Sequence, residues 1–72
     1  MEFSKNYIEY NDLGIELYNS GKGQKNKFQI ESAIQYFEKA IAAAEIEGIE
    51  DFESAKKNLE LAKEELNKLN SH

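Results

Sequence analysis

The chain of 72 residues contains no cysteine and no proline. Without cysteine, no disulfide and no thiolate-bound zinc can reinforce the core, so the fold depends on helix packing alone. The absence of cysteine also fits a reducing compartment. The absence of proline, together with many Ala, Glu, Lys and Leu residues, favours helices throughout the chain.

Long hydrophobic runs are absent too. No apolar run approaches the roughly 20 residues that span a bilayer, and the N-terminal residues 1–5 lack the basic start and apolar stretch of a signal peptide. We therefore expect a cytoplasmic protein. The formal net charge of −5 disfavours nucleic acid and anionic membranes as partners, because both carry negative charge.

The residue types that catalysis requires are scarce. The one histidine, His72, is the last residue of the chain, so the serines have no histidine partner to activate them. Carboxylate pairs such as Glu9 and Asp12 have no deep pocket in so small a domain. We predict that the protein is not an enzyme. We also expect no cofactor and no metal site, because the acidic residues lack the ligand spacing of a calcium loop.

Hydrophobic residues at helical spacing predict an all-α fold. Three amphipathic segments follow one another, at about residues 4–20, 27–47 and 51–69. A lone helical hairpin would be marginally stable, because a chain this short buries only about 60% of its unfolded surface. We therefore expect one domain over residues 1–72, a three-helix bundle in which an antiparallel hairpin packs against a third helix.

Capping residues and glycines indicate where these helices begin and end. Asn26 is expected to cap the second helix, with Gln29 as its capping-box partner, or the second helix begins nearer residue 32. Asp51 is expected to cap the third. Gly21 should end the first helix and Gly48 the second, as glycines at helix C-termini do. The lysine-rich segment 21–27 is predicted to be a flexible loop.

Two apolar stripes form the expected core. The stripe on the second helix contains Ile30, Ala33, Ile34, Phe37, Ala40, Ile41 and Ala44. Its alanines allow a neighbouring backbone to approach closely, and Gly14 on the first helix is the natural counterpart. The seam on the third helix contains Phe52, Ala55, Leu59, Ala62, Leu66 and Leu69. This seam favours packing within the monomer, and a coiled-coil dimer is the alternative.

The first helix carries two apolar stripes instead of one. The first stripe contains Tyr10, Leu13 and Leu17 beside Gly14, and the second contains Ile8, Ile15 and Tyr18 beside Asn11. Together they cover more than half of the helix circumference, which is too wide for a helix with one buried face. The second stripe is therefore either covered by another part of the chain or bound by something outside the fold.

The spacing of these residues resembles a tetratricopeptide repeat. The repeat is written W-x2-L-G-x2-Y…A-x3-F…P, and this chain has Tyr10-x2-Leu13-Gly14-x2-Leu17 followed by Ala33-x3-Phe37-x2-Ala40. The third helix stands where the first helix of a next repeat, or a capping helix, would lie. The chain departs from the family in three respects. Its connection between the two halves is longer by about seven residues, the final proline is missing, and only one copy is present.

A weaker resemblance is to the microtubule-interacting-and-trafficking domain, a three-helix unit of similar length. Its second helix favours Ala-x2-Tyr-x2-Ala, which Ala33-x2-Tyr36 matches in part, although Lys39 occupies the next place. The sequence Leu59-x2-Ala62-Lys63-Glu64-x-Leu66 is similar to the end of that domain's third helix.

The tetratricopeptide resemblance implies a binding site on the first helix, on the face turned away from its partner helix. Those places fall on Ile8, Asn11, Ile15, Tyr18 and Asn19. The implied function is a non-catalytic interaction module for a peptide or partner helix, with Tyr18 as an anchor and Asn11 as a hydrogen-bonding group. In the alternative interpretation, the third helix or Phe3 covers this stripe as ordinary core.

Two other functions are compatible with the sequence. An acidic patch consists of Glu45, Glu47, Glu50, Asp51 and Glu53. A small acidic inhibitor or antitoxin-like protein could use this patch to occupy a basic surface of a target protein. The other possibility is homo-oligomerisation through the third helix or the tyrosines.

Overall fold

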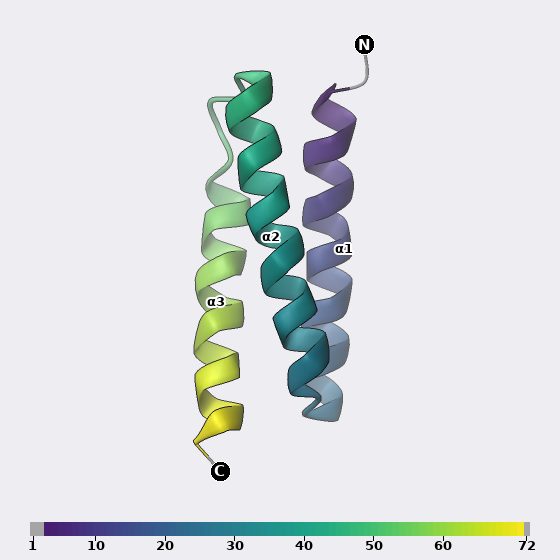
Figure 1. Ribbon diagram of the computed structural model, residues 1–72, viewed down its shortest axis with the longest axis vertical. Helices are drawn as coiled ribbons and strands as arrows, with labels where there is room; N and C mark the ends of the chain where they lie inside the picture. Colours follow the sequence, from purple (N-terminus) through teal and green to yellow (C-terminus); the bar gives the residue numbers. More distant parts are fainter. Residues whose placement is uncertain (1–2, 72) are drawn as a thin grey trace.

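The computed structural model describes the backbone of residues 3–71 and the side chains of residues 6–71. The chain forms three helices, α1 (Phe3–Gln24), α2 (Lys27–Glu47) and α3 (Glu53–Asn70). Short connections join them, so that successive helices run in opposite directions (Figure 1). The predicted all-α three-helix fold is therefore confirmed. The molecule is elongated, with extents of 44 × 15 × 13 Å.

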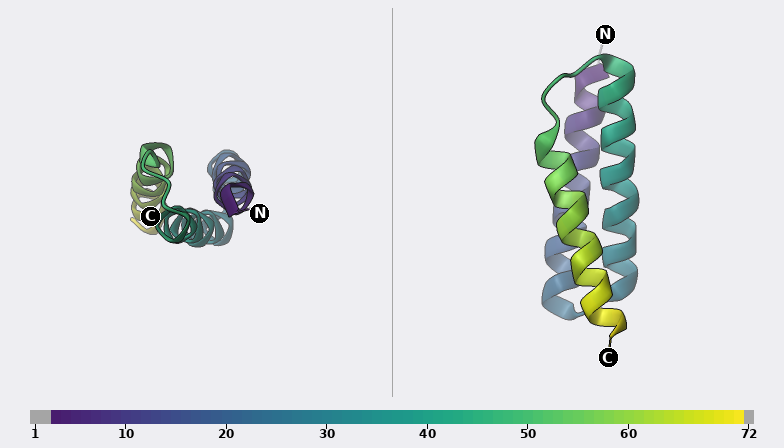
Figure 2. Two further views of the ribbon diagram at one scale, coloured as in Figure 1. Left: turned by 90° about the horizontal axis from the view of Figure 1, so that it is seen from above. Right: turned by 90° about the vertical axis from the view of Figure 1, so that its left-hand side faces the viewer.

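The middle helix, α2, holds the other two together. α1 packs along one side of α2 and α3 along another, whereas α1 and α3 approach each other at few residues. Seen along the helices, α1 and α3 are the arms of a U and α2 is its base (Figure 2). α1 and α3 consequently run parallel to each other on the same side of α2.

The core follows the stripes expected from the sequence. The fully buried residues of α2 are Ile30, Ala33, Phe37, Ala40 and Ala44, and those of α3 are Ala55 and Ala62. Partly buried leucines of α3, among them Leu59, Leu66 and Leu69, pack around them. The alternation of large and small buried side chains lets three thin helices interdigitate, as close packing requires.

Two glycines of α1 make room for α2. A Cβ atom built on Gly14 would lie 2.5 Å from Cε1 of Phe37, and one built on Gly21 would lie 2.9 Å from Cδ1 of Ile30. Gly14 and Gly21 are one heptad apart, and so are Ile30 and Phe37. The same contact therefore repeats along the antiparallel pair, and the two largest fully buried side chains each occupy a place that a glycine leaves open. The prediction of close packing at Gly14 is confirmed, although the nearest atoms belong to the ring of Phe37 and not to the alanines of α2.

Gly21 does not end α1, as the sequence had led us to expect. The helix continues to Gln24 and ends at Lys25, which has a φ of 54°. The N–H of Asn26 then donates to the carbonyl of Gly21 at 2.9 Å, which is a Schellman closure. The predicted loop over 21–27 is thus a helix end and a tight connection. A glycine is required at position 21 because a side chain there would collide with Ile30, and not because the backbone adopts a left-handed conformation.

The start of α2 agrees with the prediction only in part. The side chain of Asn26 accepts hydrogen bonds from the N–H groups of Phe28 at 3.0 Å and Gln29 at 3.3 Å, which confirms Asn26 as the cap. The alternative start near Ser32 is wrong. Gln29 does not complete a capping box, because its Oε1 accepts a hydrogen bond from Ser20 Oγ at 3.0 Å. This bond ties α1 to α2 beside their connection.

At the connection between α2 and α3, one predicted helix end is confirmed and one predicted helix cap is wrong. Gly48 ends α2 with a φ of 74°, and the N–H of Ile49 donates to the carbonyl of Ala44 at 2.9 Å, as expected of a terminal glycine. Asp51 does not cap α3. Phe52 occupies the capping position and forms no side-chain cap hydrogen bond. Asp51 therefore lies one residue too early to reach the first N–H groups of the helix.

Candidate functional site

A polar link joins α1 to α3 near their N-terminal ends. Asn58 Nδ2 donates to Asn11 Oδ1 at 3.2 Å, and Asn11 Nδ2 donates to Ser54 Oγ at 3.5 Å. Asn11 is only 9% exposed. The amide predicted to bind an external ligand is thus engaged within the fold, because α3 runs alongside α1 at this level.

Tyr7, which the sequence had not indicated, also lies near the start of α3. Burial and the nearby Asp51 carboxylate raise the pKa of the Tyr7 hydroxyl, while a hydrogen bond from the backbone of Ala55 lowers it. The hydroxyl therefore lies against the start of α3. Tyr7 is one heptad before Gly14, and this spacing could have placed it on the inner side of α1.

These contacts determine which residues of α1 and α3 lie level with each other. Asn11 is opposite Asn58, and both helices rise by about 1.5 Å per residue in the same direction. Ile15, four residues beyond Asn11, is therefore level with the turn that holds Leu61, three residues beyond Asn58. Ile8 is correspondingly level with the turn that holds Ser54.

Ile8 and Ile15 follow next to Asn11 around α1, on the side away from Gly14, which faces α2. Leu61 likewise follows next to Asn58 around α3, on the side away from the buried Ala55. From this register we infer that the outer edges of the seam form one surface, on the side of the molecule opposite α2. We call it the α1–α3 face, and its members are Ile8, Ile15 and Asn19 of α1 and Leu61 of α3. Ile8 is 54% exposed and Leu61 is 48% exposed. Ile15 is half-buried, and Asn19 is exposed.

The structure therefore divides the five residues that the tetratricopeptide resemblance had indicated. Ile8, Ile15 and Asn19 remain on an accessible surface, whereas Asn11 is inside the fold. Tyr18 packs partly against the core cluster, as Ile15 does, and Lys22 Nζ lies 5.7 Å from the centre of its ring. Leu61 joins the surface although the sequence interpretation had left it out. One feature of the sequence could have indicated Leu61: it is a leucine that lies outside the apolar seam of the third helix, seven residues after Ser54.

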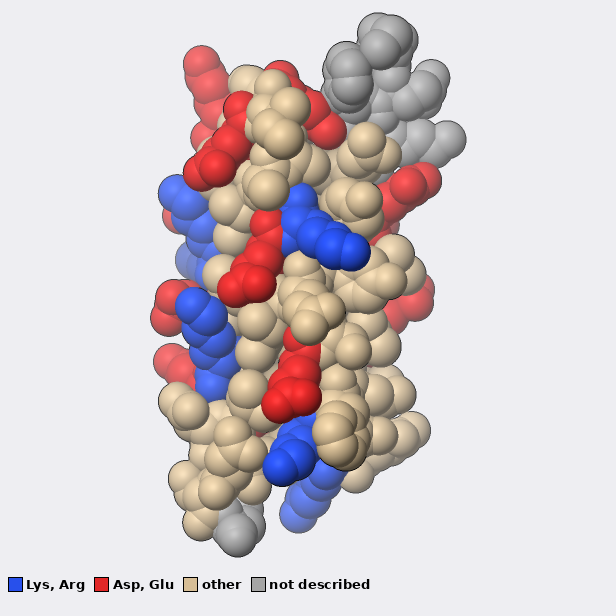
Figure 3. Space-filling view, viewed as in Figure 1, with Lys and Arg blue, Asp and Glu red and all other residues tan. Residues whose placement is uncertain are grey.

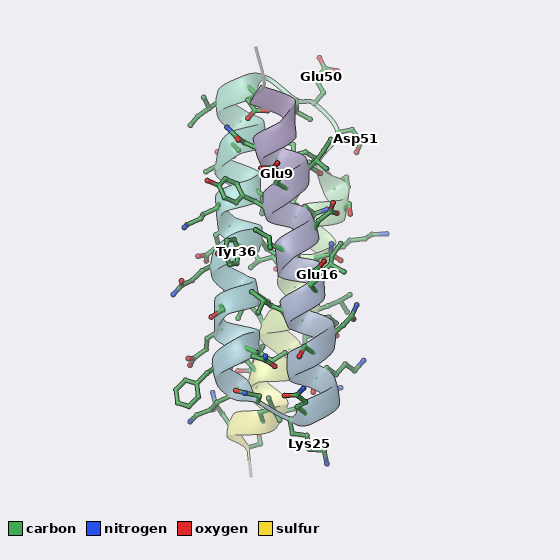
Figure 4. All side chains as sticks on the ribbon, turned by 90° about the vertical axis from the view of Figure 1, so that its right-hand side faces the viewer. Glu9, Glu16, Lys25, Tyr36, Glu50 and Asp51 are labelled. Carbon is green, nitrogen blue, oxygen red and sulfur yellow. The ribbon has the colours of Figure 1, made fainter. Side chains whose placement is uncertain are left out.

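Charged residues line α1 beside this face. Glu9, Asp12 and Glu16 are all exposed, and Figure 4 labels Glu9 and Glu16 on the outer side of α1. No basic residue occurs between Asn6 and Gly21. On the side of the molecule that faces the viewer in Figure 3, by contrast, lysines and acidic residues alternate over α2 and α3.

The predicted acidic patch lies around the connection between α2 and α3. Glu45, Glu50, Asp51 and Glu53 are exposed, and Glu47 is partly buried. Figure 4 labels Glu50 and Asp51 at this end of the molecule. Oε1 of Glu47 is buried and has no hydrogen-bond partner among the described residues. Glu53 Oε2 lies 3.7 Å from Lys56 Nζ, so one lysine neutralises part of the patch.

A third surface lies on the other side of α1, where it meets α2. The rings of Tyr10 and Tyr36 are 6.2 Å apart at an angle of 32°. Lys39 Nζ lies 5.9 Å from the centre of the Tyr10 ring and 5.4 Å from that of Tyr36. The neighbouring Leu13 is exposed. This is the tyrosine surface that the sequence suggested for homo-oligomerisation.

The described part of the chain holds no enclosed site. No pocket is found in it, and no three His, Cys, Asp or Glu residues within it are arranged to hold a metal ion. Over the same residues, no helix combines the length and the apolar character that crossing a membrane requires.

Comparison of the chain with family models, with curated proteins and with solved structures found no match. The resemblances to the tetratricopeptide repeat and to the microtubule-interacting-and-trafficking domain therefore stay predictions.

Proposed function

We propose that the protein is a non-catalytic interaction module that binds a peptide or helix of a partner protein on the α1–α3 face. One observation carries this proposal. α1 and α3 both pack on α2 but hardly on each other, and Ile8 and Leu61 are left about half exposed on the same side. A helix lying along the seam would cover both side chains and add a fourth helix to the bundle.

The size of the expected effect follows from the exposed apolar area. Fully burying an isoleucine or leucine side chain contributes about 1.5–3 kcal/mol, so covering the exposed half of Ile8 or Leu61 contributes about 1 kcal/mol. Replacing either residue with alanine should therefore weaken binding about fivefold. The tetratricopeptide resemblance supports the same face, because it assigns ligand binding to the first helix.

The test compares two pairs of exposed apolar residues. Ile8→Ser with Leu61→Ser alters the α1–α3 face. Phe28→Ser with Ile46→Ser alters the outer side of α2, where the exposed fractions are 70% and 83%. The wild type and both variants are immobilised in equal amounts and incubated with a lysate of the cell of origin, and circular dichroism checks that all three are folded.

A partner that is retained by the wild type and by the α2 variant, but lost from the α1–α3 variant, supports the proposal. A partner that is lost only from the α2 variant overturns it. Ile15 and Tyr18 are unsuitable for this test, since both pack against the core and their truncation would also destabilise the fold.

The acidic patch supports a second candidate function, a small acidic inhibitor or antitoxin-like protein that occupies a basic surface. Four of its five carboxylate residues are exposed around one connection, and Ile46 beside them is the most exposed large apolar residue between positions 6 and 71. Binding by this patch should weaken steeply as salt is added. It should be lost in Glu45→Gln with Glu50→Gln and Asp51→Asn, and salt-insensitive binding would exclude it.

Self-association is the third candidate. Two copies of the chain would contact each other through the tyrosine surface formed by Tyr10 and Tyr36, together with the exposed Leu13. Light scattering over a concentration series distinguishes it, because the mass would rise with concentration only if copies of the chain bind one another.

A further inference from the structure

Between Ile8 and Asn19, the α1 edge of the α1–α3 face carries negative charge only, and the exposed Lys22 follows three residues after Asn19. Glu9, Asp12 and Glu16 follow one another at intervals of three and four residues, so their carboxylates share one side of the helix. All three are exposed, and no ion pair is formed by any of them among the described residues. They lie next to Ile8 and Ile15 around the helix.

The α3 edge of the same face differs in charge. Lys57 lies four residues before Leu61 and Lys68 seven residues after it, so both share the side of α3 that Leu61 occupies. Glu64 lies between them, and all three are exposed. A helix bound along the seam would therefore meet carboxylates on its α1 side and mixed charge on its α3 side.

We propose that the occupant of the α1–α3 face is an amphipathic partner helix whose edge toward α1 carries lysine or arginine. This inference rests on the proposed function and adds the chemistry of the partner. Basic side chains at that edge would pair with Glu9, Asp12 and Glu16, whereas acidic side chains would be repelled. A second copy of this chain fits poorly, because each copy has a formal net charge of −5.

Three synthetic helical peptides of 18 residues test the inference. All three share one leucine stripe at intervals of three and four residues, and their flanking positions are lysine, glutamine or glutamate. Affinity is measured by fluorescence anisotropy at two salt concentrations, and the binding site is located by amide chemical-shift changes. We expect the lysine peptide to bind tightest and to shift residues around Ile8, Ile15 and Leu61. Its advantage should shrink as salt is added.

Charge reversal on the protein separates local from overall charge. The test variant is Glu9→Lys, Asp12→Lys and Glu16→Lys. The control variant is Glu31→Lys, Glu38→Lys and Glu45→Lys, which changes three exposed residues of α2. Each variant moves the formal net charge by +6, from −5 to +1. The test variant should bind the lysine peptide about tenfold more weakly than the control variant does, since three exposed ion pairs with the peptide are lost and replaced by repulsion between like charges.

The outcomes distinguish this inference from the proposed function. Equal binding of the three peptides at the α1–α3 face overturns the charge preference and leaves the proposed function standing. Equal weakening by the two protein variants also overturns it, because overall charge then explains the effect. Binding at another surface, or no binding of any peptide at millimolar concentration, overturns both.

Discussion

Replacing Gly14 with alanine should destabilise the protein, although alanine is the better helix former. The added methyl carbon would lie 2.5 Å from Cε1, 2.6 Å from Cδ1 and 3.0 Å from Cζ of Phe37. Real Cβ atoms do not approach other carbons so closely. The ring of Phe37 is 1% exposed and packed on all sides, so either the ring must leave its rotamer or α1 must move away from α2.

The two opposing effects can be compared in magnitude. Overfilling a packed core costs about 1–3 kcal/mol, while exchanging glycine for alanine inside a helix stabilises by about 1 kcal/mol. Because the approach to the buried Phe37 ring is as short as 2.5 Å, the overfilling cost should lie in the upper part of its range, about 2–3 kcal/mol, so the expected net loss for Gly14→Ala is about 1–2 kcal/mol. In a domain of this size, 1 kcal/mol corresponds to about 4–8 °C in Tm, so Tm should fall by roughly 5–15 °C.

The other glycines of α1 provide matched controls. Nothing lies within 4 Å of a Cβ built on Gly23, so Gly23→Ala should raise Tm slightly. At Gly21 the nearest atoms, which belong to Ile30 and Gln29, lie 2.9–3.0 Å away instead of 2.5 Å, so Gly21→Ala should cost less than Gly14→Ala. Thermal unfolding followed by circular dichroism at 222 nm, together with urea titration, should rank the variants Gly23→Ala, Gly21→Ala, Gly14→Ala in order of decreasing stability.

A second substitution tests whether the ring of Phe37 is the cause. Phe37→Leu removes the ring atoms that the new methyl would meet, so Gly14→Ala should cost much less in that background than in the wild type. The reasoning is refuted if Gly14→Ala melts at or above the wild-type temperature. It is also refuted if Gly14→Ala costs the same in both backgrounds.

Two further predictions concern the link between α1 and α3. Asn11→Ala should destabilise the fold by about 0.5–1.5 kcal/mol, because the half-buried Asn58 and the exposed Ser54 lose their hydrogen-bond partner. The exposed Asn19→Ala should have little effect in the same thermal assay, and equal effects would contradict the role of Asn11. The pKa of Tyr7 is raised in the folded state, so the unfolded chain loses this proton first and stability should fall as the pH rises above about 10. Tyr7→Phe should make the stability measured by urea titration between pH 9 and 11 fall less steeply, and an unchanged slope would argue against a raised pKa.

The candidate site was only partly accessible from the sequence. The sequence showed that α1 has more apolar positions than one buried side needs, and this indicated the second stripe. Ile8, Ile15 and Asn19 do lie on an accessible surface. Whether a residue of that stripe is covered depends on where α3 lies, which no local pattern reports. For this reason the tetratricopeptide resemblance placed Asn11 on the binding surface although it is buried against α3, as the alternative interpretation allowed, while Leu61 was not predicted at all.

Helix type and the buried sides of α2 and α3 were determined locally, because apolar residues at a 3.6-residue period need only their own segment to form a stripe. The caps at Asn26 and Gly48 were readable for the same reason, since each acts within one turn. The tertiary structure alone decided that Gly21 lies inside a helix, because the space it leaves is filled by Ile30 from another helix. It also decided that α1 and α3 stand side by side on α2, since their relative positions follow from how two separate faces of α2 are packed.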